Sequence, residues 1–208
     1  MTVRRFEDGG LGTRFEVDDA FTPGLPPAAP AGLPDNVRAA CLARSDAAGQ
    51  AVLSIARVEV GYETSPQELA EQLVIHNRFT AHTAEQRGWT IHSPWKATML
   101  AGYPAMHCDY VVPASAGRVA QGRPEPAWPI APAETGPPAP QALPLAGSDA
   151  EAGPPGHVQA WVAYVGPVTW QVMLGVDPPG DLDANRRVMD RVTRTFELFE
   201  PAGQEPVE

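Results

Sequence analysis

The sequence predicts an α+β fold in which a twisted antiparallel sheet is covered by helices, as in an α/β/α sandwich. Three observations predict it. Runs of alternating apolar residues come in pairs around short turns, as at 101–104 and 166–167. The segments 65–88 and 181–199 have the cap residues and apolar spacing of helices. The strands also occur in runs between these helices, an order typical of antiparallel rather than parallel sheets.

The chain opens with a predicted hairpin. The triplet Asp8-Gly9-Gly10 is a turn signal between 4–7 and 12–18, where Phe6, Phe15 and Val17 are the apolar positions. The stretch 22–34 contains five prolines, so we expect a connector in extended or turn conformations.

Two further strands are predicted before the first helix. Alternating apolar residues at 37–41 indicate the first of them, and a turn at 45–50 leads into the β-rich run 51–61. We expect this second run to be a central strand of the sheet.

The helix predicted at 65–88 begins with Ser65-Pro66-Gln67-Glu68, which combines an N-cap serine, proline in the first turn and a glutamate able to complete a capping box. Arg87 and Gly88 are typical of a helix end. The apolar face is expected to contain Leu69, Leu73 and Val74, widened by Ile75 and Phe79.

After Gly88 the apolar period changes to that of a strand, and Ala101-Gly102-Tyr103-Pro104 predicts a hairpin turn. In the strand that follows, Cys108 belongs to a core-facing set of alternate residues, whereas His107 and Asp109 take the other face.

The prolines of 113–156 and the absence of periodicity predict an insertion loop. A second hairpin is predicted at 157–176 around Gly166-Pro167. A last helix, capped by Asp181 or Asp183, should end at Pro201 and present one apolar stripe. That stripe is Val188, Val192, Phe196 and Phe199.

We therefore expect a single domain over 1–200 and an acidic, frayed tail over 201–208.

Composition excludes several classes of function. With 208 residues, a formal net charge of -10 and a pI near 4.9, the chain lacks the basic surface that nucleic acids and anionic membranes require. No signal peptide or spanning segment is apparent, which predicts a cytoplasmic location. Cys41 and Cys108 are expected to be buried free thiols, although a disulfide between two strands is geometrically conceivable.

No catalytic or metal motif stands out. His76 and His82 are six residues apart and point to different sides of their helix, so they cannot chelate as an i, i+4 pair. His107 and Asp109, with His92 on the neighbouring strand, could hold zinc or act as a general base, but no nucleophile accompanies them. The chain is thus expected to be no enzyme, with no cofactor and no bound metal.

Several segments resemble the PsbP-like fold shared by the photosystem P-subunit, the Ran-binding Mog protein, DcrB-type and LpqN-type proteins and Eag-type chaperones. The resemblance rests on the opening hairpin with its Gly-Thr-Arg-Phe-Glu-Val strand, on 100–105, on 168–172 and on the closing Arg194-Thr195-Phe196. It implies a binding protein without a catalytic constellation. The absence of an export signal makes the cytoplasmic chaperones the closer comparison.

The functional hypothesis is a non-enzymatic adaptor or chaperone of a bacterial secretion or assembly system that binds another protein, for example an apolar helix of a secreted or assembled client. A homodimer is compatible with it. The alternative is a small-molecule or lipid carrier with an apolar cavity between sheet and helices. The side chains expected to form the partner-binding face are Trp89, Trp95, Trp161, Trp170, Tyr103 and Tyr110.

Overall fold

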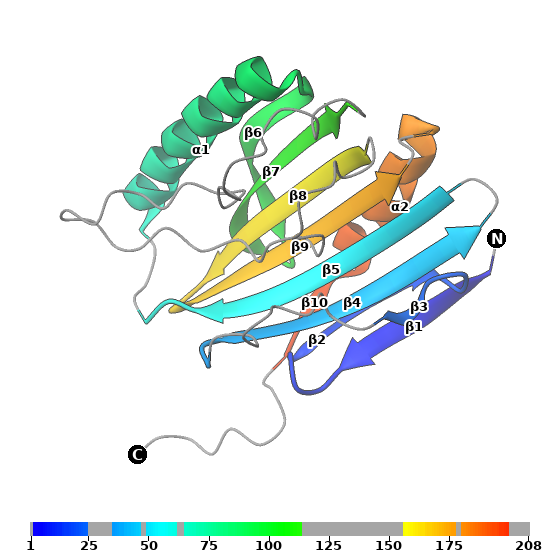
Figure 1. Cartoon of the computed structure of the whole chain (residues 1–208). Helices are drawn as coiled ribbons and strands as arrows, with labels where there is room; N and C mark the ends of the chain where they lie inside the picture. Colours follow the sequence, from blue (N-terminus) through cyan, green and yellow to red (C-terminus); the bar gives the residue numbers. More distant parts are fainter. Residues whose placement is uncertain are drawn as a thin grey trace, which may run out of the picture.

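The computed structural model describes residues 2–24, 35–46, 49–61, 65–113, 156–177 and 180–199. The interior of the predicted insertion 113–156, at 114–155, and the tail 201–208 lie outside the described residues. Figure 1 shows a broad sheet with one helix beside its edge and the other behind it.

The larger sheet has seven strands and is antiparallel throughout, as predicted. The hairpins at 101–102 and 166–167 turn where the sequence indicates, because Ala101, Gly102 and Gly166 adopt the positive φ angles that such tight turns need. In spatial order the strands are β3 (Thr22–Gly24), β4 (Val37–Asp46), β5 (Gly49–Glu59), β9 (Val168–Asp177), β8 (Gly156–Val165), β7 (Tyr103–Val112) and β6 (Thr90–Leu100).

The opening hairpin does not join this sheet. β1 (Val3–Asp8) and β2 (Thr13–Asp18) pair with β10 (Glu197–Leu198) in a separate three-stranded sheet. The expectation of a single layer was therefore wrong. The small sheet depends on a pairing between the two ends of the described chain, which local sequence patterns do not reveal.

Helix α1 (Pro66–Arg87) begins and ends as predicted. Ser65 and Glu68 form a capping box, and Gly88 adopts a left-handed conformation at the C-terminal end. The helix lies along β6 at the edge of the large sheet (Figure 1).

The side that α1 turns to the sheet differs in part from the prediction, because Leu69 and Leu73 pack against the sheet but Val74 and Ile75 do not. His76, Thr80 and Thr83 are buried, whereas Val74 and Ile75 are 58% and 45% exposed. The buried side carries polar groups because it packs around Trp95, as the contacts of α1 with β6 below show.

Helix α2 (Leu182–Thr195) covers the opposite face of the sheet. Its N-cap is Asp181, whose carboxylate accepts hydrogen bonds from the backbone of Asp183 and Ala184. The helix ends at Thr195 rather than at Pro201, because the next residues turn away to form β10. Phe199 therefore lies outside the helix, while Phe196 still packs into the core.

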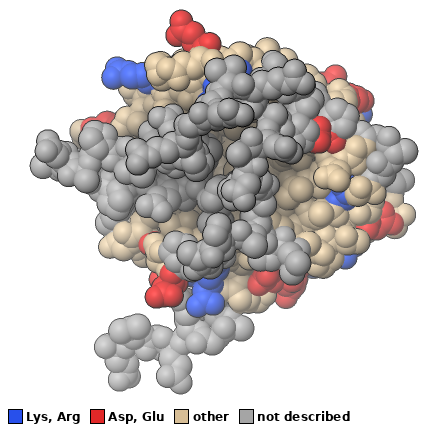
Figure 2. All heavy atoms as spheres, in the orientation of Figure 1, with Lys and Arg blue, Asp and Glu red and all other residues tan. Residues whose placement is uncertain are grey.

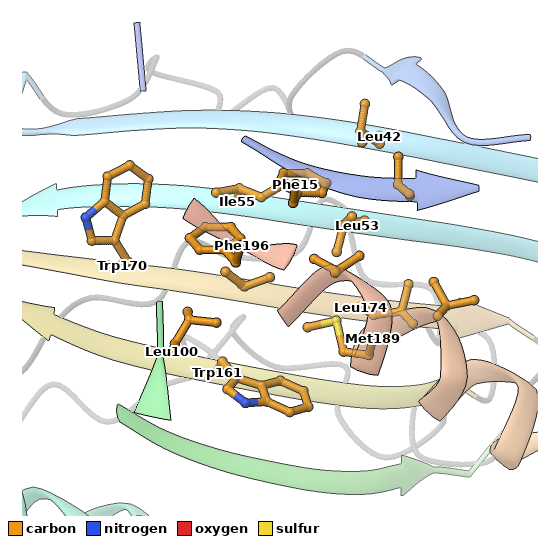
Figure 3. Close-up of a cluster of buried hydrophobic side chains, with 14 of the residues drawn as sticks. Phe15, Leu42, Leu53, Ile55, Leu100, Trp161, Trp170, Leu174, Met189 and Phe196 are labelled. Atoms are coloured by element: carbon orange, nitrogen blue, oxygen red, sulfur yellow. The ribbon is translucent and has the colours of Figure 1, made fainter. Parts of the chain in front are cut away.

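The main core lies between α2, the small sheet and one face of the large sheet. Figure 3 shows Phe15, Trp170 and Phe196 converging there with aliphatic side chains from the strands. A second cluster on the other face contains Trp95, Met106, Tyr110 and Met173, against which Leu69 of α1 and its neighbours pack. Cys41 and Cys108 are both buried and free, which confirms the expectation of two thiols.

Candidate functional site

The six aromatic residues predicted to form one partner-binding face do not lie together. Trp161 and Trp170 belong to the core beneath α2, whereas Trp95 and Tyr110 belong to the cluster on the opposite face. All four are buried, and Tyr103, at 40% exposed, is accessible. These residues are divided between the two faces because side chains alternate along each strand, and the aromatic positions of different strands fall on opposite sides of the sheet.

Trp95 is the centre of the contact between α1 and β6. Its indole nitrogen donates a hydrogen bond to Oγ1 of Thr80 at 3.0 Å. The ring of His76 lies 5.1 Å from it, centroid to centroid. The Asn77 side chain accepts from the Trp95 backbone nitrogen at 2.7 Å and donates to the Trp95 carbonyl oxygen at 2.9 Å. This residue therefore fixes the helix to the edge of the sheet.

Trp89 continues the same contact at the end of α1. Its ring stacks on that of Tyr110 at 4.9 Å with an interplanar angle of 6°. Trp89 is only partly buried. Trp89, Trp95 and Tyr110 are thus brought together on one face, in a structural cluster.

Asp109 contacts other residues than His107 and His92, with which the sequence analysis grouped it. Its two carboxylate oxygens contact His157 Nε2 at 2.8 Å and Arg186 Nε at 2.8 Å. On the other side of that imidazole, Nδ1 lies 3.2 Å from the side-chain amide of Asn185. His107, which shares the face, instead lies against Trp161 with ring centroids 3.8 Å apart.

The grouping of His107, Asp109 and His92 is therefore not a metal site. His92 is exposed, and within the described ranges no three His, Cys, Asp or Glu side chains are placed to hold a metal ion. The alternation of side chains along β8 could have indicated His157 as the partner of Asp109, because His157 lies on the same face of the sheet as Trp161, which contacts His107. The sequence separation of 48 residues between Asp109 and His157 hid the pairing.

The electrostatics of this cluster favour a structural role. Burial alone would raise the pKa of Asp109, but the hydrogen bonds and charges of His157 and Arg186 outweigh burial and hold it below its ordinary value. The His157 side chain is fully buried, so it has no surface for a substrate to reach. The cluster joins β7 and β8 to the first turns of α2. Its hydrogen bonds and ion pairs therefore hold the helix against the sheet.

A cavity of about 360 Å³ lies on the outer side of α2. Carboxylates already neutralise much of the positive charge of the arginines that line this cavity. Arg191 pairs with buried Asp18 of β2, and Arg187 lies 3.6 Å from Asp181. Asp190 is itself part of the wall. The residues that line it are Arg187, Asp190, Arg191, Arg194 and Thr195.

Most of the exposed large apolar side chains among the described residues come from the elements at the β6 end of the large sheet. Val74 and Ile75 come from α1, Met99 from β6 and Tyr103 from the start of β7. We call these four residues the open-edge surface. On the face shown in Figure 2, by contrast, charged side chains of the described residues are dispersed around the rim without forming a patch of one sign.

Comparisons with known proteins identify the fold. No known protein family matches the sequence, and no curated protein matches it either. The solution structure of cyanobacterial PsbP from Synechocystis superposes with a TM-score of 0.52 over 95% of this chain and 92% of that protein. The chain has a PsbP-like fold. At 13% sequence identity, the similarity establishes the fold alone.

Two further structures were similar. A protein from Bacteroides thetaiotaomicron superposes with a TM-score of 0.50 at 9% identity over 98% of this chain, which spans 51% of that protein. LpqN, involved in cell envelope biogenesis of Mycobacterium tuberculosis, gives a TM-score of 0.37 at 12% identity over 94% and 91% of the two chains. Among the described residues, neither helix has the length and apolar character needed to cross a membrane.

Proposed function

We propose that this PsbP-like chain is a non-enzymatic, cytoplasmic protein-binding protein that acts as an adaptor or chaperone in a bacterial secretion or assembly system. The observation that carries the proposal is the open-edge surface. Of the five exposed large apolar side chains in the described part of the chain, four belong to α1 and the adjoining β6 and β7 strands. Exposed apolar side chains concentrated on adjoining elements are typical of a region that another protein covers.

The chemistry of this surface favours an apolar segment of the client, such as the apolar face of a helix. Val74 and Met99 are each 58% exposed, so covering them removes apolar area from water. Ile75 adds exposed apolar area on α1, and Tyr103 adds it on the hairpin, on the sheet face opposite to Met99. An aromatic side chain with a polar tip is favoured in such interfaces.

A role without catalysis is supported by the way the acid–base residues are used. The Asp109–His157 pair is buried and serves to hold α2, and Arg186 closes it on the outer side. The carrier alternative is less well supported, because the α2 cavity lies on the outer side of the helix rather than between sheet and helices, and four of its five lining residues are charged.

The proposal can be tested with a photo-crosslinking phenylalanine analogue placed at Met99 or Tyr103 in the native host. Tyr103 should give adducts with a protein other than this chain. Val3, an exposed apolar residue on the separate small sheet, is the matched control and should give none. If no position of the open-edge surface captures a protein other than this chain, the proposed function is wrong.

A further inference from the structure

The outer edge of β6 is a strand edge that no other strand of the described residues covers. β6 is the last strand of the seven-stranded sheet, and β7 is its sole strand partner among the described residues. In an antiparallel pair, successive residues turn their N–H and C=O groups alternately toward the partner and away from it. The two-residue turn after Leu100 makes Leu100 and Tyr103 a hydrogen-bonded pair, so the groups of Met99 and Ala97 point outward.

One outward-facing residue is already satisfied. The Asn77 side chain forms hydrogen bonds with both the N–H and the C=O of Trp95. Pro94, just before it, has no N–H to offer. The edge is therefore closed by α1 as far as Trp95 and open at Ala97 and Met99, where Met99 is also among the most exposed apolar side chains.

We infer that a second copy of this chain pairs with this open edge, β6 against β6, to form a two-fold symmetric dimer with a continuous sheet. An antiparallel pair centred on Thr98 brings Ala97 opposite Met99 of the second copy, and the converse. These two residue pairs would exchange about four backbone hydrogen bonds. The next pairing is blocked on both sides, because Asn77 occupies Trp95 and the hairpin turn begins at Ala101.

The side chains at this edge are complementary to themselves. On the face that α1 covers, each Met99 lies beside the small Ala97 of the second copy, which leaves room for the longer side chain. On the other face Thr98 meets Thr98 of the second copy, a favourable cross-strand pair. Ala97 and Met99 are both exposed and uncharged, so the pairing removes apolar surface from water without burying a charge.

The two α1 helices would also meet across the two-fold axis. Val74 lies three residues before Asn77, and so on the side of α1 that faces the open edge. Ala70 and Ala81 share that side and are exposed, and their small side chains let two helices approach closely. An antiparallel helix pair centred on Val74 and Ile75 sets exposed Glu71 opposite Arg78 of the second copy.

This inference rests on the proposed function, since it names the protein that covers the Met99 and Val74 part of the open-edge surface. The failure of this inference can be distinguished from the failure of the proposed function. A chain that is monomeric when purified, but is crosslinked through Met99 to a different protein in the host, overturns the dimer and leaves the proposed function intact. A purified dimer with no other crosslinked partner supports the inference and removes the client.

The test is sedimentation velocity of the purified chain over a dilution series. We expect the wild type to form a dimer that dissociates on dilution. Met99→Lys should shift the chain to monomer, because a charge on an edge strand opposes pairing. Val3→Glu, an equivalent change on the small sheet, should leave the dimer unchanged. A monomeric wild type, or a dimer that withstands Met99→Lys, overturns the inference.

A backbone substitution separates strand pairing from other association through apolar side chains. Ala97→Pro removes an outward N–H that the fold does not use, so it should abolish the dimer. Amide exchange on the wild type gives the same information if that variant fails to fold. The Ala97 and Met99 amides should be protected at high concentration and exchange rapidly on dilution. Equal exchange at both concentrations contradicts the pairing.

Discussion

Asn77 on α1 and Trp95 on β6 are joined through the backbone of one residue and the side-chain amide of the other. The amide both accepts from and donates to that backbone, at 2.7 and 2.9 Å, as a neighbouring strand residue would. The helix thereby supplies the missing partner of a strand edge at the point where the register of β6 shifts. This one contact fixes both the position of α1 and the extent of the open edge.

Replacing Asn77 with Ala should destabilise the fold. Two partly buried backbone groups of Trp95 lose their partners, and we expect a loss of about 2 kcal/mol in the free energy of unfolding, measured by urea denaturation. Asn77→Asp retains the acceptor and should cost less. Asn36, whose amide makes one exposed hydrogen bond to Glu59, provides the matched control Asn36→Ala, which should be near neutral. Equal losses in Asn77→Ala and Asn36→Ala would contradict this account.

Asp109→Asn should weaken the contact of α2 with β7 and β8 and lower the free energy of unfolding. The substitution leaves Arg186 and His157 without their carboxylate, and breaking a buried charge pair typically costs about 3 kcal/mol. Asp183, which also contacts Arg186 but is exposed, gives the control Asp183→Asn, expected to cost far less.

The same carboxyl makes stability depend on acid pH. Because the folded pKa of Asp109 lies below its ordinary value of 3.8, its stabilising contribution is complete above that pH and is lost as pH falls through the folded pKa. The free energy of unfolding of the wild type should therefore decline below about pH 4, and Asp109→Asn should decline less steeply. Parallel curves would show that Asp109 is not the source.

His76 should give a second pH dependence at milder acidity. Burial lowers its pKa from 6.5 to about 4, so the unfolded chain binds the proton more readily than the folded one between these values. Stability is then lost as pH falls below 6.5, by about 2 kcal/mol between pH 7 and pH 5. Urea denaturation at the two pH values checks it. His76→Gln should remove that dependence, and the same replacement at exposed His82 is the control.

Both thiols should be unreactive in the folded protein. Burial raises the pKa of Cys108 and of Cys41, so little thiolate is present, and neither side chain is accessible. A colorimetric thiol reagent should detect almost none in the native chain and both in denaturant. Reaction of one thiol without denaturant would place that cysteine outside the core.

The parts of the fold that could be predicted from sequence are those with local chemistry. The Ser65 capping box and the left-handed Gly88 lie within a few residues of the helix ends that they define. The turn at Ala101-Gly102 likewise sets the register of the two strands beside it. These features need no knowledge of distant residues.

The features that sequence reasoning missed depend on residues far apart. β10 exists because residues 197–198 find β2. Asp109 is held by Arg186, 77 residues away. The orientation of α1 was also misjudged, because Val74 appeared to belong to its apolar face. Thr80 and Asn77 face the sheet instead, because they accept hydrogen bonds from the indole and the backbone of Trp95.

The pairing of β10 with β2 has a consequence for biosynthesis. Residues near position 14 leave the ribosome long before residues 197–198, so the third strand of the small sheet is added only when nearly all of this chain has been translated. Until then Phe15 lacks the stacked ring of Phe196, 5.7 Å away in the finished fold. The nascent protein must keep that apolar hairpin from aggregating until residues 197–198 have been translated.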